Sequence, residues 1–288
     1  MKDSDWKILT VLYEKRSMTK AAEALYMTQS ALTKRIRSME DEWHVEIVRR
    51  SSQGVVFTEE GKYLVQKANI MVDFLKEIEQ HFADGTAKEL LRIGVPNSFA
   101  RLHMSELLRE YMEHFDRLQI RTISNSSDVI LQQLMDGTVD IGIICGDYPY
   151  LGEKVCLFEE ELYIVTQQEK MLDDIAQMPL IESNFNPMVR TMVHQWWKHQ
   201  FGSLPHDSHR VPYADIAIEM VENGLGNTYF FGDKWRINEE KLRKIPVYGR
   251  EDEPVRRKVW MMISERCYQS RDIMDFISMV EAYYLVNT

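Results

Sequence analysis

The stretch of sequence that decides the fold of the N-terminal region is SMTKAAEALYMTQSALTKRIR, residues 17–37. Ser17 and Thr28 each precede a helical pattern, and their hydroxyl groups can accept hydrogen bonds from the free N–H groups at a helix start. After Thr28, the apolar residues Leu32, Ile36 and Met39 are spaced four and three apart, which predicts one buried stripe on a helix. Two short helices separated by a tight turn form a helix-turn-helix, whose second helix enters the major groove of DNA.

The polar face of the second helix carries side chains suited to reading DNA. Glutamine can pair with adenine, arginine or lysine with guanine, and hydroxyl groups with several base edges or with phosphates. Arg35 is not counted, because it can point elsewhere. We predict that one set of residues contacts DNA directly and that another supplies supporting phosphate contacts: Gln29, Ser30, Thr33, Lys34 and Arg37 in the first set, and Thr19, Lys20 and Arg50 in the second.

The segments that follow extend this motif. Residues 45–58, VEIVRRSSQGVVFT, predict two short strands around a turn, which would form a wing beside the second helix. Thr58 then caps a long helix that ends near residue 85 and has acidic residues in its first turn. Its apolar residues follow a heptad pattern, which favours a dimerisation seam over the alternative of an amphipathic helix packed on its own domain. The seam residues are Leu64, Ala68, Met71, Leu75, Ile78 and Phe82.

The charge of the chain is unevenly distributed. Over 288 residues the formal net charge is −10, which by itself argues against a nucleic-acid partner. The segment 1–60 is neutral overall, however, and the segment 15–37 carries a net charge of +5. The acidic excess therefore belongs to the rest of the chain, and the total charge is a poor guide to the partner.

From residue 90 the sequence changes to strands that alternate with helices. Apolar strands near 90–95, 118–123 and 141–144 are separated by helices, an order that predicts a parallel sheet covered by helices. A strand at 162–165 leaves this sheet for a second α/β region, and a strand at 259–263 returns before a terminal helix. We expect a winged helix-turn-helix at 1–60, a linker helix at 58–85 and a two-lobed α/β domain at 90–288. Lobe I would comprise about 90–162 and 257–288, and lobe II about 163–256.

The segment 1–60 resembles the DNA-binding domain of LysR-type transcriptional regulators. That family shows Ser-x-Thr-x-Ala-Ala-x-x-Leu, a Gln-Ser/Pro-Ala-x-Ser helix, a Leu-Glu pair and a Thr-x-x-Gly wing end. The corresponding segments here are 17–25, 29–33, 39–40 and 58–61. Thr33 stands where serine is common, Trp43-His44 replaces Leu-Gly, and residues 47–50 depart from Leu-Phe-x-Arg, changes that bear on wing packing or operator preference. The rest of the chain is similar to the family's effector domain, which looks like a type 2 periplasmic binding protein.

The resemblance implies a homodimer or homotetramer that binds double-stranded promoter DNA with dyad symmetry and responds to a small-molecule effector between two lobes. Contact with RNA polymerase and the sign of regulation are left open. In α/β sheets ligands bind at the carboxyl ends of strands, where hydroxyl groups, amides and helix N-termini suit a carboxylate or another small anion. On this basis the candidate effector residues are Asn97, Ser98, Ser124, Ser126, Ser183 and Asn184, with plain helix capping as the alternative for each.

Other classes of protein are disfavoured. No apolar run approaches the ~18–20 residues of a membrane helix, and the N-terminus lacks the apolar stretch of a signal peptide. Three widely spaced cysteines do not suggest disulfides, so we expect a cytoplasmic protein. We find no metal site, cofactor motif or catalytic frame, which argues against an enzyme, and Gly224-Leu225-Gly226 predicts a tight turn rather than a dinucleotide loop. A transported binding protein of the same two-lobed fold would need export and would leave the segment 1–85 unexplained.

Overall fold

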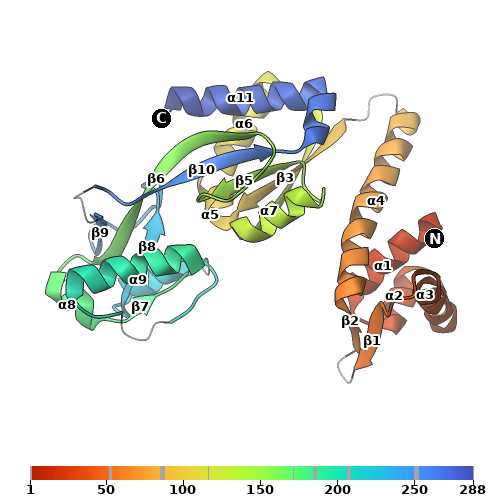
Figure 1. The fold of residues 1–288 in the computed structure, drawn as a ribbon, viewed down its shortest axis with the longest axis horizontal. Coiled ribbons are helices and arrows are strands. Elements are labelled where there is room, and N and C mark those ends of the chain that lie inside the picture. The colour runs from red at the N-terminus through yellow and green to blue at the C-terminus, as the bar shows by residue number, and fades with distance from the viewer. Residues whose placement is uncertain are drawn as a thin grey trace. The chain divides into compact units, whose positions relative to one another are not determined.

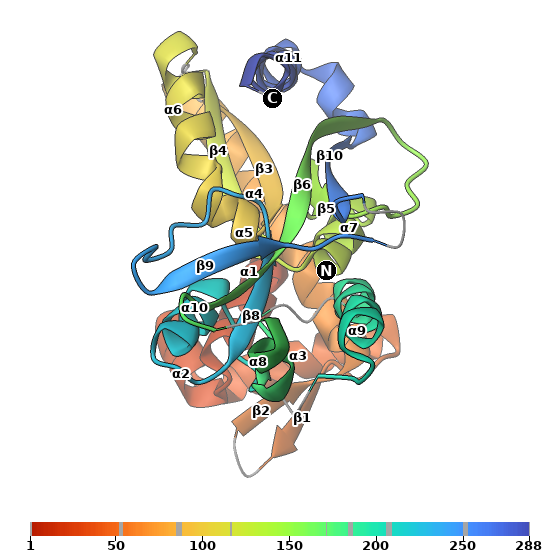
Figure 2. The ribbon, with the colours of Figure 1, turned by 90° about the vertical axis from the view of Figure 1, so that its left-hand side faces the viewer.

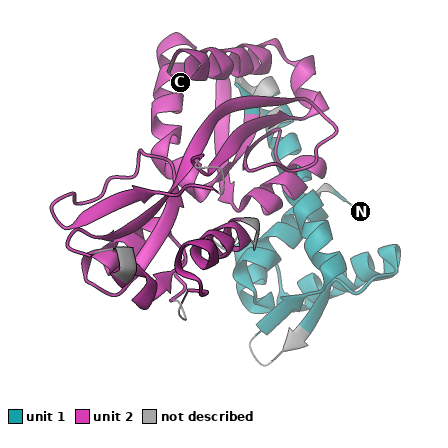
Figure 3. Ribbon diagram, turned by 60° about the vertical axis from the view of Figure 1, so that its left-hand side comes forward, with its two compact units in different colours: residues 1–90, 136–138 teal, residues 91–135, 139–288 magenta. Residues whose placement is uncertain are grey.

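A computed structural model describes residues 2–51, 54–84, 88–115, 117–170, 172–183, 187–205, 209–249 and 253–287. The chain divides into two compact units, which Figure 3 distinguishes by colour. The first unit comprises residues 1–90 and 136–138, and the second comprises residues 91–135 and 139–288.

The first unit is a winged helix-turn-helix followed by a long helix, as the sequence predicts. Its elements are α1 (Asp3–Lys15), α2 (Met18–Ala24), α3 (Gln29–Trp43), β1 (Val48–Ser51), β2 (Gly54–Phe57) and α4 (Glu59–Asp84). Ser17 and Thr28 cap α2 and α3 by accepting hydrogen bonds from the backbone N–H groups of Lys20 and Ala31. The stripe of Leu32, Ile36 and Met39 is buried in a core that also includes residues of α1, α2, α4 and the antiparallel β1–β2 wing.

Two close contacts fix the helices of this unit. Arg35 forms an ion pair with Asp5, whose side chain is fully buried, and thereby ties α3 to α1. Burial alone would raise the pKa of the Asp5 carboxyl, but the hydrogen bonds from Arg35 and from the backbone N–H of Lys2 outweigh it and lower that pKa. At the start of α4, a Cβ atom on Gly61 would collide with the carbonyl oxygen of Ile47. Only glycine lets α4 approach the wing this closely.

The heptad residues of α4 do not all face outward. Leu64 and Ala68 are buried in the core of the unit itself, where α4 packs against α1, so including them in a dimerisation seam was wrong. The alternative of packing on the same domain applies to this half of the helix, because α1 supplies the neighbouring helix. Met71, Ile78 and Phe82 are exposed and Leu75 is half-buried. These four residues remain the predicted seam.

The second unit has two lobes that share one strand. The strand order is β4-β3-β5-β10-β6-β8-β7, with β9 paired to β6. The elements are β3 (Glu89–Pro96), α5 (Asn97–Leu102), α6 (Met104–His114), β4 (Leu118–Asn125), α7 (Ser127–Met135), β5 (Ile141–Cys145), β6 (Lys154–Gln167), α8 (Leu172–Gln177), β7 (Leu180–Ile181), α9 (Pro187–Phe201), α10 (Ala214–Glu222), β8 (Asn227–Phe231), β9 (Leu242–Pro246), β10 (Arg256–Ile263), the 3-10 helix η1 (Glu265–Gln269) and α11 (Arg271–Asn287).

We call the part around β4, β3, β5 and β10 lobe I. Its sheet lies between α6 and α11 on one face and α7 on the other (Figure 1). The predicted parallel pairing holds for β3 with β5, whereas β10 returns antiparallel to both β5 and β6. The helical segment between β3 and β4 is divided into α5 and α6, which meet at His103.

We call the part around β7, β8 and β9 lobe II. Its strands are covered by α8 and α9 on one face and by α10 on the other. The 14-residue strand β6 pairs with β10 along its first part and with β8 and β9 along its second part, so it continues from one lobe into the other (Figures 1 and 2). The two lobes are therefore joined by continuous strand structure at β6.

Candidate DNA-binding surface and effector cavity

The predicted base-reading residues share one solvent-facing surface of α3. Gln29, Ser30, Lys34 and Arg37 are exposed, and Thr33 is half-buried. Thr19 on α2 is exposed as well, and its hydroxyl donates a hydrogen bond to the side-chain oxygen of Gln29, with 3.4 Å between the two oxygens. This contact uses the side-chain oxygen of Gln29, whose side chain is exposed to solvent. The surface therefore presents donors, hydroxyl groups and positive charge together.

Other predicted residues of this surface have different outcomes. Lys20 is exposed on α2, next to Thr19. Arg50 lies in β1, opposite Val55 of β2, and its side chain is outside the described residues. Arg35 points to Asp5 in the interior, which agrees with leaving it out of the DNA contacts.

Sequence reasoning missed Tyr26, whose side chain is 99% exposed in the turn between α2 and α3. Its backbone has φ of +53°, a conformation in which few residues other than glycine, asparagine and aspartate are common. The ring is therefore exposed to solvent just before α3 begins. The signal in the sequence was present, because a tyrosine in a turn of this motif has no core to enter.

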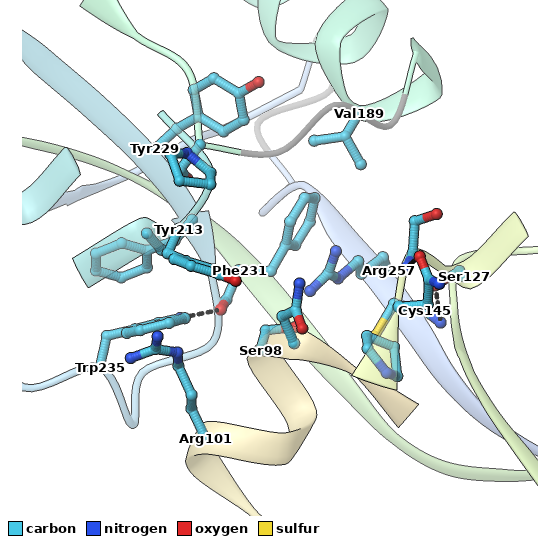
Figure 4. A pocket seen from close by; sticks show the side chains of 18 residues that line it. Ser98, Arg101, Ser127, Cys145, Val189, Tyr213, Tyr229, Phe231, Trp235 and Arg257 are labelled. Atoms are coloured by element: carbon cyan, nitrogen blue, oxygen red, sulfur yellow. Dashed lines mark hydrogen bonds between the residues drawn. The ribbon is translucent and has the colours of Figure 1, made fainter. Parts of the chain in front are cut away.

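A cavity of about 150 Å³ lies between the two lobes of the second unit (Figure 4). Lobe I lines it with the starts of α5 and α7, with Cys145 at the end of β5 and with Arg257 of β10. Lobe II lines it with Ser183, with the segment before α10 and with the aromatic residues of β8. We call this the effector cavity. Its mixture of aromatic rings, hydroxyl groups and one buried cation is typical of a site for a small organic molecule.

The structure places the predicted effector residues unequally. Asn97, Ser98, Ser126 and Ser183 line the cavity. Ser124 does not line it. Its hydroxyl donates a hydrogen bond to the side-chain oxygen of Asn97, with an O–O distance of 2.6 Å, and lies 3.2 Å from the backbone oxygen of Val95. Ser124 therefore supports Asn97 rather than a ligand. Asn184 lies outside the described residues.

The buried ion pair between Arg257 and Glu160 was missed in the sequence. The Nε and Nη2 atoms of Arg257 lie 2.9 and 2.7 Å from one oxygen of Glu160, and the guanidinium carbon lies 4.2 Å from the ring centre of Phe231. The side chains of Arg257 and Glu160 are only 8% and 6% exposed. Three consecutive glutamates at 159–161 and the run Arg-Arg-Lys at 256–258 could have signalled it, since two adjacent antiparallel strands place these runs opposite each other.

A second cavity adjoins the other side of this pair. It is lined by Glu160, by His103 at the junction of α5 and α6, and by Tyr284 of α11. His103 is buried among Phe99, Phe158 and Tyr284, and burial lowers its pKa to about 4, with Lys234 acting in the same direction and Glu160, Glu106 and Asp233 opposing. The Arg257–Glu160 pair therefore separates two cavities.

Other sequence interpretations concern a cysteine, a glycine turn, metal binding and membrane helices. Cys145 is buried, and burial raises the pKa of its thiol to about 12, which is the opposite of a reactive cysteine. Gly224 and Gly226 both have positive φ and form the predicted turn. Within the described ranges, no group of three or more His, Cys, Asp or Glu side chains is arranged to hold a metal ion. In the same part of the chain, no helix combines the length and the apolar character that a bilayer span requires.

The sequence matches two family models. Residues 4–62 match the model described as "Bacterial regulatory helix-turn-helix protein, lysR family", and residues 84–284 match the "LysR substrate binding domain". The chain belongs to the LysR family of transcriptional regulators. It is therefore a DNA-binding regulator of LysR type, with a DNA-binding domain followed by an effector-binding domain.

Full-length relatives have the same organisation. The "Uncharacterized HTH-type transcriptional regulator YraN" of Bacillus subtilis is 26% identical over 290 residues, which cover 99% of each chain. Among solved structures, the LysR family regulator CbnR superposes with a TM-score of 0.72 at 16% identity, over 98% of this chain and 99% of that one. The structure of full-length CbnR with its target DNA gives a TM-score of 0.73 at the same identity and coverage. The low identity means that these structures establish the fold alone.

Proposed function

We propose that this LysR-type regulator binds a promoter through α2, α3 and the wing and that a small molecule in the effector cavity controls its activity. The observation that supports the DNA part most directly is the shared exposure of Gln29, Ser30, Lys34 and Arg37 on one face of α3. We assign residues 1–60 to DNA binding, 58–85 to dimerisation and 90–288 to effector binding. The protein acts without catalysis, in the cytoplasm with the chromosomal DNA.

The oligomer follows from the second half of α4. Met71, Ile78 and Phe82 are exposed apolar side chains at heptad spacing on a helix whose first half is already packed. Such a stripe is stable in water when a second copy covers it. We propose that two chains pair through this stripe and thereby present two copies of α3 to a dyad-symmetric operator.

The test is a selection of DNA sequences by the purified full-length protein, followed by binding measurements on the selected site. Gln29→Ala should weaken binding by ~1–3 kcal/mol and relax selectivity at one base position. Gln195→Ala, at an exposed glutamine of α9, is the matched control and should leave affinity unchanged. If the folded protein selects no sequence, or if Gln29→Ala and Gln195→Ala behave alike, the proposed DNA interface is wrong.

A further inference from the structure

Three acidic residues of β6 lie opposite three basic residues of β10, and two of these pairs form ion pairs. The register places Glu159 opposite Lys258, Glu160 opposite Arg257 and Glu161 opposite Arg256. Both members of the middle pair are buried, whereas the Arg256–Glu161 pair has a similar separation of 2.8 Å but side chains that are 51% and 32% exposed. Burial therefore distinguishes the Arg257–Glu160 pair from its exposed neighbour.

The two members of the buried pair line different cavities. Arg257 lines the effector cavity, whereas Glu160 lines the second cavity. A guanidinium has five N–H donors in a planar fork, and Glu160 takes the edge formed by Nε and Nη2. The other edge, with three N–H groups on Nη1 and Nη2, makes no hydrogen bond with any described residue. Figure 4 shows the Arg257 side chain among the residues that line the effector cavity.

The walls around this free edge define what fits beside it. The volume of about 150 Å³ is similar to that of an engineered cavity that holds benzene, so the occupant is a small molecule of about one ring. Phe231, Tyr213 and Trp235 supply flat apolar walls. Tyr229 also lines the cavity from lobe II, but its hydroxyl is buried and has no hydrogen-bond partner among the described residues.

From these contacts we infer that the effector cavity takes a small carboxylate, which accepts hydrogen bonds from the free edge of Arg257 while Glu160 holds the opposite edge. A carboxylate matches this edge bidentately. Glu160 sets the affinity, because it already neutralises Arg257 and repels a second negative charge. This inference rests on the proposed effector role of the cavity and names the ligand class and the residue that selects it.

The experiment measures binding to the full-length protein by calorimetry, with propanoate and benzoate as probes and propanamide and benzamide as their neutral counterparts. We expect each carboxylate to bind at least tenfold more tightly than its amide. Glu160→Gln should tighten carboxylate binding at least fivefold, because it removes the competing negative charge and keeps a hydrogen-bond acceptor for Arg257. Glu161→Gln is the matched control on the neighbouring, exposed pair and should change binding less than twofold.

Removal of Arg257 alone would leave Glu160 buried without a partner and endanger folding. The double variant Arg257→Gln/Glu160→Gln avoids this problem because it leaves two neutral side chains that can hydrogen-bond each other. It should fold, as judged by circular dichroism, and bind carboxylates and amides equally weakly. The control is the double variant Arg256→Gln/Glu161→Gln, which should retain the wild-type preference for carboxylates over amides.

The inference is overturned if neither carboxylate binds better than its amide, or if the double variant at 257 and 160 retains the wild-type preference. Failure of the proposed function has a different signature. If the protein binds carboxylates through Arg257 but selects no DNA sequence, the ligand site is supported and the proposed regulator function is wrong. If the protein selects a DNA sequence but shows no preference for carboxylates, only the proposed ligand site is wrong.

Discussion

His103 makes the stability of the second unit depend on pH in a way that one substitution should abolish. Its ring is 6% exposed, lies 4.8 Å from the ring of Phe158 and 5.0 Å from that of Phe99, and its Nδ1 atom has no partner among the described residues. Burial lowers its pKa from the ordinary 6.5 to about 4. The folded chain therefore keeps His103 neutral at a pH where the unfolded chain already binds the proton.

The direction and size of the effect follow from this difference. Because the unfolded state binds more protons between pH 6.5 and 4, the stability contributed by neutral His103 is complete above pH 6.5 and is lost as the pH falls toward 4. Between pH 7 and pH 5 the loss is about 2 kcal/mol for these two pKa values. For a unit of this size that corresponds to a decrease in Tm of about 4–8 °C. Groups that do not interact with His103 contribute equally to wild type and to a variant that lacks only this imidazole.

The assay compares wild type with His103→Phe, which keeps an aromatic ring in the stack of Phe99 and Phe158. Urea unfolding of the full chain at pH 7, 6 and 5 is followed by tryptophan fluorescence. We expect the free energy of unfolding to fall about 2 kcal/mol further in wild type than in His103→Phe over this range. His114→Gln, at an exposed histidine of α6, should follow wild type. Parallel curves for wild type and His103→Phe would refute the burial argument.

Three further predictions concern the first unit. Gly61→Ala should destabilise it by about 1–3 kcal/mol, because the new Cβ would collide with the carbonyl oxygen of Ile47, and urea unfolding will show whether the midpoint falls. Arg35→Ala should cost about 3 kcal/mol, because the buried Asp5 carboxylate would lose its ion pair and keep only the hydrogen bond from the Lys2 backbone N–H. It should nevertheless preserve DNA selectivity below the melting temperature, and a change in selectivity would mean that Arg35 contacts DNA. Ile78→Glu should lower the mass measured by analytical ultracentrifugation, whereas an unchanged oligomer would place the seam elsewhere on the chain.

The fold could be predicted from sequence where local chemistry and periodicity agree. In the first unit, the hydroxyl caps at Ser17 and Thr28 and the spacing of Leu32 and Ile36 both specify the same two helices, and the structure has them. The pattern failed at Leu64, because a heptad spacing identifies an apolar face but not the element that covers it. The covering element is α1, which lies at the start of the chain and is separated from α4 by α2, α3 and the wing.

Local sequence likewise predicts only part of the candidate sites. Strand ends are visible in the sequence, and four of the six predicted effector residues line the cavity. Ser124 could not be separated from Ser126, because its hydroxyl is used by Asn97, a residue of a neighbouring segment that only the fold brings near. Arg257 was missed because strand pairing, rather than local sequence, brings its charge opposite Glu160 and buries both.

The position of β10 has a consequence for how this protein is made. In the sheet of lobe I, β10 lies between β5 and β6, yet in the chain it comes after all of lobe II. All of lobe II must therefore be synthesised before β10 can complete the sheet of lobe I. Until β10 emerges, β5 and β6 expose unpaired edges, which invite association with other nascent chains. Chaperone capture of this segment during synthesis, and severe aggregation of chains truncated before residue 256, would both follow from the order of these strands.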